Sequence, residues 1–140
     1  MFKNFIERFG YYDLFIIDNE TNNIVYTVYK EIDFASSISS KAFKNTNLAI
    51  AFNSVKNAAN CNISKLVDYK PYHPSYNAHS SFIACPIFDG VKQIGVLAFQ
   101  MPIDKINDIM TNNQQWEKVG LGKSGETYII AEDFTLQMPL

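Results

Sequence analysis

Residues 68–101, DYKPYHPSYNAHSSFIACPIFDGVKQIGVLAFQM, decide the fold. In this stretch an aromatic loop interrupted by prolines leads into two apolar segments, residues 82–88 and 92–101. The pair Asp89-Gly90 joins the two segments and is typical of a two-residue hairpin turn with positive φ at both central positions. We therefore expect a β-hairpin that supports the aromatic loop.

Both predicted hairpin strands are apolar on both faces. Strands of this kind lie centrally in a sheet that is covered on at least part of each side. Pro86 has no N–H group, and we expect a bulge or an interruption of the neighbouring ladder at this position. Alternation along the chain assigns the side chains of each strand to two faces. In the first strand one face carries Ile83, Cys85 and Ile87 and the other carries Phe82, Ala84 and Phe88. In the second strand one face carries Ile94, Val96 and Ala98 and the other carries Gly95, Leu97 and Phe99.

The residues before this stretch predict a helix, a hairpin and a second helix. A short N-terminal helix ends at Gly10, and its apolar face consists of Phe2, Phe5, Ile6 and Phe9. Residues 11–18 and 24–29 have the composition of strands around a polar turn. Residues 47–59 carry apolar side chains with helical spacing, and Asn45, Thr46 or Asn47 is available as the N-cap.

The remaining segments complete the predicted order of elements. Residues 63–69 fit either a short strand or a loop. Residues 102–110 predict a helix with Pro102 at its first position and with Ile103, Ile106, Ile109 and Met110 directed inward. Residues 126–131 predict a further strand. Two hairpins with a helix between them predict an α+β fold, with a PAS-like antiparallel five-stranded sheet flanked by helices and an N-terminal helix.

Length and composition exclude several classes of protein. The chain of 140 residues has a net charge of −2 and 47% hydrophobic residues, which favours one ordinary globular domain. Lysines are scattered and Arg8 is the only arginine, so nucleic acid is not an expected partner. A bidentate arginine clamp on a ligand carboxylate or phosphate is not expected beyond Arg8. No apolar stretch approaches the roughly 20 residues that cross a bilayer.

The aromatic loop carries the best candidate binding chemistry. Tyrosine rings offer flat apolar walls with a polar tip, and an asparagine side chain offers a donor and an acceptor, which suits a pocket for a small polar organic molecule. The alternative is an ordinary loop whose aromatic side chains pack over the edge of the sheet. Asp33, followed by Phe34, is a candidate acceptor for a ligand ammonium group, whereas Asp89 fits a turn residue. The candidate ligand-binding residues are Tyr69, Tyr72, His73, Tyr76, Asn77, Phe82, Asp33 and Phe34.

Catalytic and metal chemistry have no recognisable pattern. His73 and His79 lack a third or fourth residue at a spacing typical of zinc. Ser80 and Ser81 beside His79 do not form a nucleophile elbow, and the glycines of GLGKSGET do not follow the order of a phosphate-binding loop. We expect no catalytic residue, no metal site and no cofactor. Cys61 and Cys85 could pair or remain free.

The runs YYDLFIIDNETNNIVYTVYKEIDFA (residues 11–35), DYKPYHPSYNAHSSFIACPIFDGVKQIGVLAFQMPIDKINDIM (68–110) and WEKVGLGKSGETYIIAEDF (116–134) carry a family likeness. They resemble the Cache-type, PAS-like sensor modules of bacterial methyl-accepting chemotaxis proteins and related transmembrane receptors. The resemblance implies a membrane-distal sensor module in residues 1–112, and a linker with the truncated start of a membrane-proximal module in residues 113–140. Some members bind amino acids through an Arg and a Trp before the central hairpin, and neither occurs between Asp68 and Phe82.

The resemblance implies a function outside the cytoplasmic membrane. We expect the periplasmic ligand-sensing domain of a bacterial chemoreceptor, sensor kinase or cyclase, with a small molecule as its ligand and no catalytic activity of its own. The membrane would be reached through segments that this sequence does not contain. The alternative is a PAS-like dimerisation or spacer module without a ligand. In either case the apolar face of the N-terminal helix predicts a homodimer.

Overall fold

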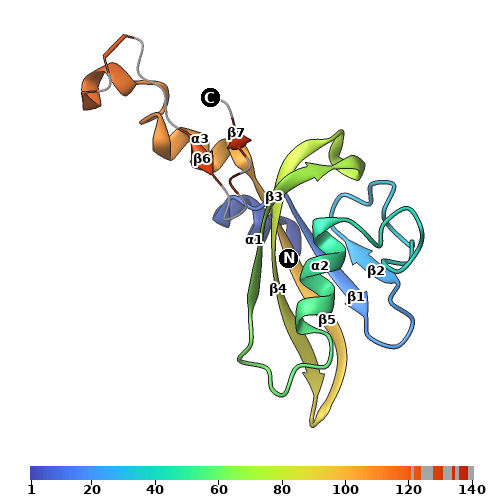
Figure 1. Cartoon of the computed structure of the whole chain (residues 1–140). Helices are drawn as coiled ribbons and strands as arrows, with labels where there is room; N and C mark the ends of the chain where they lie inside the picture. The colour runs from blue at the N-terminus through green and yellow to red at the C-terminus, as the bar shows by residue number, and fades with distance from the viewer. Residues whose placement is uncertain (121, 124–127, 131–133, 135, 139–140) are drawn as a thin grey trace.

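The computed structural model describes residues 1–120, 122–123, 128–130, 134 and 136–138 (Figure 1). Its main feature is a five-stranded antiparallel sheet with the strand order β2-β1-β5-β4-β3. The helices are α1 (Phe2–Phe9), α2 (Asn47–Val55) and α3 (Ile103–Met110). The strands are β1 (Asp13–Asp18), β2 (Ile24–Thr27), β3 (Lys65–Tyr72), β4 (Ala78–Asp89) and β5 (Lys92–Pro102). The predicted α+β class and sheet are confirmed.

The core lies between one face of the sheet and α2 (Figure 1). Thr46 is the N-cap, as one of the three predicted candidates, and its hydroxyl accepts a hydrogen bond from the backbone N–H of Ala49 at 3.2 Å. The helix ends at Val55, four residues before the predicted end. Its buried apolar side chains Leu48, Ala49, Ala51, Phe52 and Val55 pack against Phe15, Ile17, Ile24, Ile38, Tyr72, Phe82, Ala84, Val96 and Ala98.

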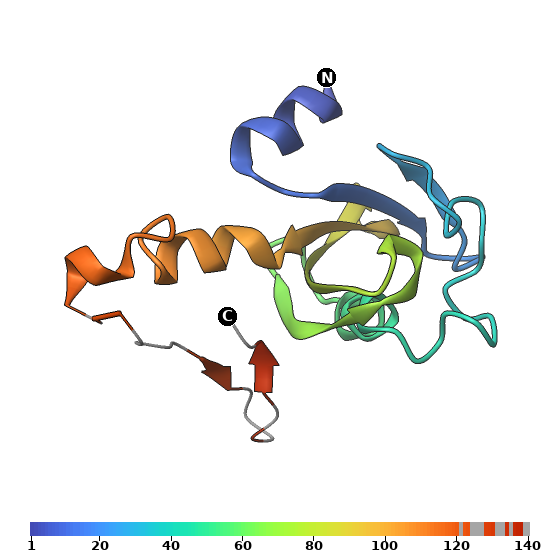
Figure 2. The ribbon, with the colours of Figure 1, turned by 90° about the horizontal axis from the view of Figure 1, so that it is seen from above.

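The opposite face of the sheet is partly covered by α1 (Figure 2). Ile6 is fully buried, and the ring of Phe5 lies 5.6 Å from that of Phe99 on β5. Gly10 ends the helix with a φ of 75°, as its position predicted. Coverage on two sides explains why the central strands β4 and β5 have no polar face.

The central hairpin follows the predicted strands but turns one residue later. Asp89 pairs with Lys92, so the two-residue loop consists of Gly90 and Val91. Only Gly90 of these has positive φ, at 58°, which is the pattern of a type II′ turn and not of the predicted turn with two positive values. The ladder between β3 and β4 ends at Ala84, so Pro86 lies beyond it, as its missing N–H predicted.

Three further expectations are wrong in part. Residues 63–69 do contain a strand, but β3 continues to Tyr72 and β4 begins at Ala78, so the predicted loop shrinks to residues 73–77. Pro102 is the N-cap of α3 and not its first residue. No side chain of α3 is fully buried and Ile109 is 76% exposed, because the helix extends away from the sheet (Figure 2).

The chain beyond α3 forms little further secondary structure among the described residues. It contains a 3₁₀ helix, η2 (Trp116–Val119), and a small sheet of β6 (Ile129–Ile130) and β7 (Leu136–Met138). The predicted strand at residues 126–131 includes β6, while residues 126, 127 and 131 lie outside the described part. No helix in the described part is long and apolar enough to span a membrane.

Close packing at Gly95 yields a test of the sheet register. A Cβ atom at Gly95 would stand 2.9 Å from the carbonyl oxygen of Ile17 on the neighbouring strand. We expect Gly95→Ala to lower the free energy of unfolding by about 1 to 3 kcal/mol, measured by urea denaturation. Val91→Ala is the control, because Val91 is 99% exposed at the hairpin turn. Equal stability of the two variants would contradict the register of β1 on β5.

Candidate functional site

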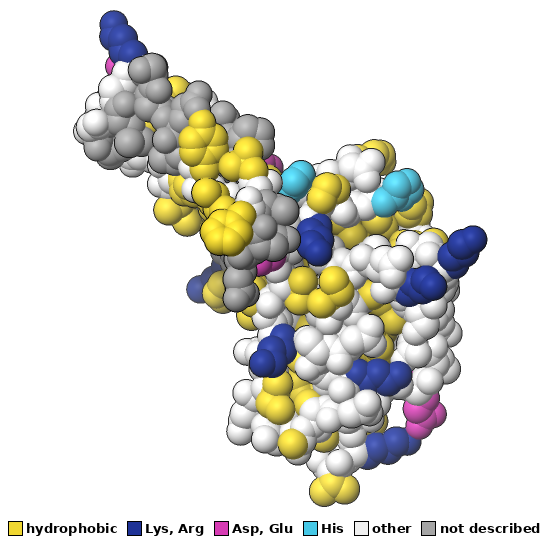
Figure 3. Space-filling view, in the orientation of Figure 1, with side chains coloured by type: hydrophobic (Ala, Val, Ile, Leu, Met, Phe, Trp, Pro, Cys, Tyr) yellow, Lys and Arg dark blue, Asp and Glu magenta, His cyan; other side chains and the backbone are white. Residues whose placement is uncertain are grey.

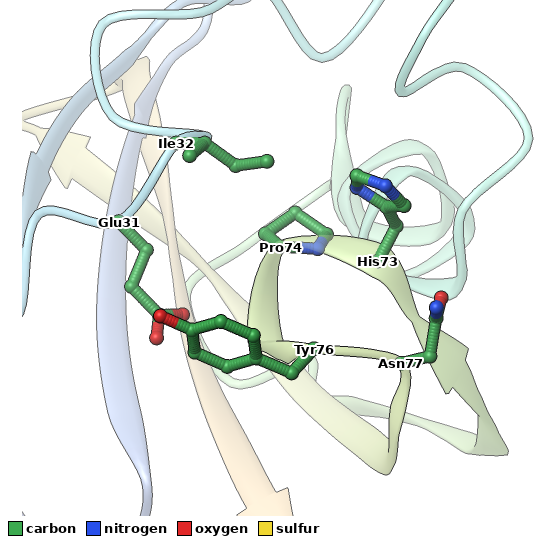
Figure 4. A pocket seen from close by; sticks show the side chains of 6 residues that line it. All are labelled: Glu31, Ile32, His73, Pro74, Tyr76 and Asn77. Carbon is green, nitrogen blue, oxygen red and sulfur yellow. The ribbon is translucent and has the colours of Figure 1, made fainter.

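A cleft opens where the segment after β2 faces the turn between β3 and β4 (Figure 4). Glu31 and Ile32 form one wall, and the turn forms the other. The side chains of the two walls point toward each other, and the ring of Tyr76 extends toward Glu31 (Figure 4). The cavity has a volume of about 410 Å³ and is lined by Glu31, Ile32, His73, Pro74, Tyr76 and Asn77.

The turn has an unusual backbone that exposes Tyr76 and Asn77. Residues His73–Ser75 form a 3₁₀ helix, η1, and Tyr76 and Asn77 follow with φ of 54° and 59°. Positive φ is uncommon for a tyrosine and costs conformational energy. The N–H of Asn77 donates to the carbonyl of Tyr72 at 3.1 Å and closes the turn. As a result the Tyr76 side chain is 92% exposed at the mouth of the cleft.

A second cavity of about 300 Å³ adjoins the first and shares Tyr76 with it. Gln100, near the end of β5, contributes to its lining and is 1% exposed. The first turn of α3 contributes Ile103 and Asp104, so this cavity connects the sheet with that helix. Its complete lining is Tyr12, Ser75, Tyr76, Ala78, His79, Ser80, Gln100, Pro102, Ile103 and Asp104.

A chain of hydrogen bonds links the two cavities behind Tyr76. The hydroxyls of Tyr12 and Ser75 donate to the two carboxylate oxygens of Glu31, at 2.8 and 2.9 Å. The side-chain amide of Gln100 donates to the hydroxyls of Ser75 and Ser80, at 3.0 and 2.8 Å. Burial, followed by the hydrogen bond to Glu31 and the charge of Glu31, raises the pKa of Tyr12 to about 12.

Beneath the first cavity, a buried hydrogen bond connects the two walls. The hydroxyl of Tyr72 donates to Oδ2 of Asp33 at 2.7 Å, and both side chains are fully buried. The Tyr72 ring packs edge to face against Phe82, with 5.0 Å between centroids. Burial raises the pKa of Asp33, and the charge of Glu31 raises it further. Burial and the neighbouring Asp33 likewise raise the pKa of Tyr72.

A second buried carboxyl group, Asp13 at the start of β1, adds to this electrostatic environment. Its Oδ1 accepts hydrogen bonds from the backbone N–H groups of Leu14 and Val28, at 2.6 and 2.9 Å. Burial raises its pKa from 3.8 to about 6, against the lowering effect of those hydrogen bonds, and the charge of Asp33 contributes to the increase. The site therefore contains three carboxyl groups that interact electrostatically: Asp13, Glu31 and Asp33.

The structure brings six of the eight predicted site residues to this region. His73, Tyr76 and Asn77 line the first cavity, while Asp33, Tyr72 and Phe82 form the buried layer behind it. The other two lie elsewhere. Tyr69 lines a groove of about 320 Å³ between α1 and α3, and Phe34 is a surface residue whose ring contacts Lys30 at 5.7 Å.

Sequence reasoning missed Asp13, Glu31, Ser75 and Gln100. Two of these carry a detectable signal in the alternation of the strands. Gln100 has the same parity as the core residues Val96 and Ala98, and Asp13 has that of Phe15. A polar residue in the inward series of an apolar strand is buried and requires partners. Glu31 and Ser75 lie in irregular segments, where buried and exposed positions do not alternate regularly. No sequence pattern therefore identifies them.

Other chemistry-bearing residues do not extend the site. Within the described residues no three His, Cys, Asp or Glu side chains are grouped in a way that would hold a metal ion. Cys61 is exposed and Cys85 partly buried, and the two are not bonded to each other. Figure 3 shows both histidines near one end of the molecule, while lysines are dispersed over that face.

Comparison with known proteins identifies the fold. The sensor domain of the V. cholerae histidine kinase DctB superposes with a TM-score of 0.52 and 14% sequence identity. The DctB domain is a Cache-type, PAS-like sensor, and this chain shares its fold. The match covers 76% of this chain and 36% of the DctB chain, so this chain spans little more than a third of the DctB domain. No protein-family model and no curated protein sequence matches the chain.

The raised pKa of Asp13 predicts a specific pH dependence of stability. The folded state binds this proton more tightly than the unfolded chain, so folding becomes less favourable as the pH rises from about 4 through about 6. Asparagine would keep an acceptor for Leu14 and Val28 without the charge. We expect Asp13→Asn to be more stable than the wild type above pH 6, by on the order of 2 kcal/mol, and equally stable near pH 4.

The measurement is urea denaturation of both proteins across this pH range. Asp18→Asn is the matched control, because hydrogen bonds from Thr21 lower the pKa of Asp18. That variant should change in the opposite direction and lose stability at neutral pH. An Asp13→Asn protein that is less stable than the wild type at pH 7 would contradict this prediction. It would show that the hydrogen bonds to the Asp13 carboxylate outweigh the cost of its burial.

Proposed function

We propose that this chain is the ligand-sensing domain of a bacterial transmembrane receptor and that the small molecule binds in the cleft between Glu31 and Tyr76. The observation that carries the proposal is the pair of adjoining cavities, with an aromatic mouth and a hydrogen-bonded polar floor. Such a combination of apolar walls and a few fixed polar groups is typical of small-molecule sites. The fold shared with the DctB sensor domain supports a role in signal transduction.

Several finer parts of the function belong to the same proposal. Residues 1–112 form the membrane-distal sensor module, and residues 113–140 form a linker and the beginning of a membrane-proximal module. The domain is periplasmic and attached to the membrane through other segments of its receptor. The output is chemotaxis, a kinase or a cyclase. The domain performs no catalysis itself, since its polar groups are arranged to hold a molecule and not around a nucleophile.

A dimerisation module without a ligand is the second candidate. The observation that favours it is the exposure of apolar side chains on α1, where Phe2, Phe5 and Phe9 are 37%, 41% and 60% exposed. Only Ile6 of this helix is buried against the sheet. Exposed apolar side chains gathered on one helix are a common feature of subunit interfaces.

Ligand binding is tested by a thermal-shift screen of the domain against amines, amino acids, organic acids, sugars and nucleobases. A ligand at about a hundred times its dissociation constant stabilises the folded state by roughly 2.7 kcal/mol, which raises the melting temperature by several degrees. We expect Tyr76→Ala to abolish this increase without altering the unliganded melting temperature, because the Tyr76 side chain is exposed. Leu66→Ala, an exposed position on β3, should respond like the wild type. A cooperatively folded domain that no compound stabilises would refute the sensing function.

Sedimentation analysis of the domain tests the dimer. We expect a homodimer that Phe9→Ser weakens or dissociates, since Phe9 has the largest exposed fraction of the three phenylalanines on α1. Leu66→Ser removes an exposed apolar side chain from β3 and should leave the dimer intact. A wild-type domain that is monomeric at all concentrations would exclude dimerisation by this isolated module.

A further inference from the structure

The polar floor of the site and the buried layer behind it contain acceptors that lack donors. Within the described part of the chain, Oε1 of Gln100, Oδ1 of Asp33 and Oδ2 of Asp13 are buried and accept no hydrogen bond. Leaving a buried acceptor without a donor costs free energy, and more so for a carboxylate. Of these three groups, Gln100 lines the second cavity directly. The site is therefore short of hydrogen-bond donors, and a molecule that supplies them would be stabilised there.

The orientation of the Gln100 amide follows from its partners. The Ser75 hydroxyl donates to Glu31 at 2.9 Å, and the Ser80 hydroxyl donates to the carbonyl of Ala78 at 3.2 Å. Both serine hydrogens are thus used, so the serine oxygens can only accept from Gln100. The NH₂ group must face the two serines, and Oε1 must face away from them as an acceptor. Oε1 of Gln100 is therefore an acceptor without a donor.

The charge of the site has the same sign throughout. Glu31 lines the first cavity and Asp104 the second, and among the described residues that line either cavity there is no lysine or arginine. Lys30 is adjacent to Glu31 in sequence, but its ammonium group lies over the ring of Phe34. Asp13 and Asp33, behind the floor, add to the negative potential. An anionic ligand would meet repulsion from these carboxylates, and the basic side chains among the described residues that line the cavities are the histidines His73 and His79.

The aromatic side chains suit the same kind of ligand. Tyr12 and Tyr76 both line the second cavity, and Tyr76 also lines the first, where the hydroxyl end of its side chain points toward Glu31 (Figure 4). A carboxylate and a tyrosine ring that line the same cavity can offer an ammonium group an ion pair and a cation–π contact.

We propose that the ligand is an organic amine that carries no carboxylate, with its ammonium group held between Glu31 and Tyr76 and a further donor directed to Oε1 of Gln100. This inference rests on the proposed function and specifies the chemical class of the ligand. The carboxylate of Glu31 binds the ammonium group, and Gln100 accepts a hydrogen bond from a donor that reaches the second cavity.

The test is isothermal titration calorimetry with two matched series that differ only in the end group. The first series is putrescine, butanediol and succinate, and the second is tyramine, tyrosol and hydroxyphenylacetate. We expect binding of the amine in at least one series and no detectable binding of its alcohol or acid. Glu31→Gln should weaken amine binding by at least about tenfold, as the loss of an ion pair in a partly buried site predicts. Glu20→Gln, an exposed carboxylate beyond the far end of β1, should bind like the wild type.

Different failures overturn different statements. Binding of the alcohols or acids in preference to both amines would refute the amine proposal and leave the sensing function intact. If no compound of either series binds, and an anionic or neutral compound raises the melting temperature in the screen, the amine proposal is likewise refuted and the sensing function is not. Amine binding that is unchanged in Glu31→Gln would refute the assignment of the ammonium site. The sensing function and this inference would both be refuted only if the protein is folded and no compound of the whole screen raises its melting temperature.

Discussion

The hydrogen bond from Tyr72 to Asp33 is the interaction on which the site depends. It joins the irregular segment between β2 and α2 to the end of β3, at 2.7 Å and fully buried. Asp33 would otherwise place a carboxyl group in the core with only neighbouring backbone N–H groups to stabilise it. Tyr72 is held by the edge-to-face contact with Phe82, which in turn packs against Phe15 at 5.9 Å. The position of Glu31, two residues before Asp33, is thereby fixed from the core outward.

A second set of polar contacts fixes the turn from below. The amide of Asn47, at the first residue of α2, donates to the carbonyls of Ser80 and Asp68. The hydroxyl of Ser81 donates to the carbonyl of Val67 at 2.7 Å. These contacts lie where the register of β3 on β4 shifts between Val67 and Lys70, so side chains satisfy carbonyls at the irregularity. These hydrogen bonds therefore hold β3 and β4 in place next to the turn that carries Tyr76.

This irregularity also explains which parts of the site the sequence could predict. Hydrophobic periodicity identified β1, β2, α2 and the central hairpin, because each buries a face with a regular period, whereas β3 was left open between a strand and a loop. The candidate loop was overestimated because Pro71 marks a break in most strands but is tolerated on the edge strand β3. Simple alternation places Val67 and Tyr69 on one face. The register shift at residues 68–69 reverses that parity, so that Tyr72 enters the core and Tyr69 lines the groove near α3.

Under the proposed sensing function, α3 is the element through which occupation of the cleft would be passed on. Gln100 and the first residues of α3 line the same cavity, so a molecule there contacts β5 and the helix that continues from it. The Lys105 side chain of α3 packs over Gly10, where α1 ends, which connects the two helices directly. If α3 has two positions relative to the sheet, a ligand shifts the equilibrium between them only by the difference between its affinities for the two. The exposed side chains of α3 and its few contacts with the sheet make α3, and not the packed helix α2, the element with room to move.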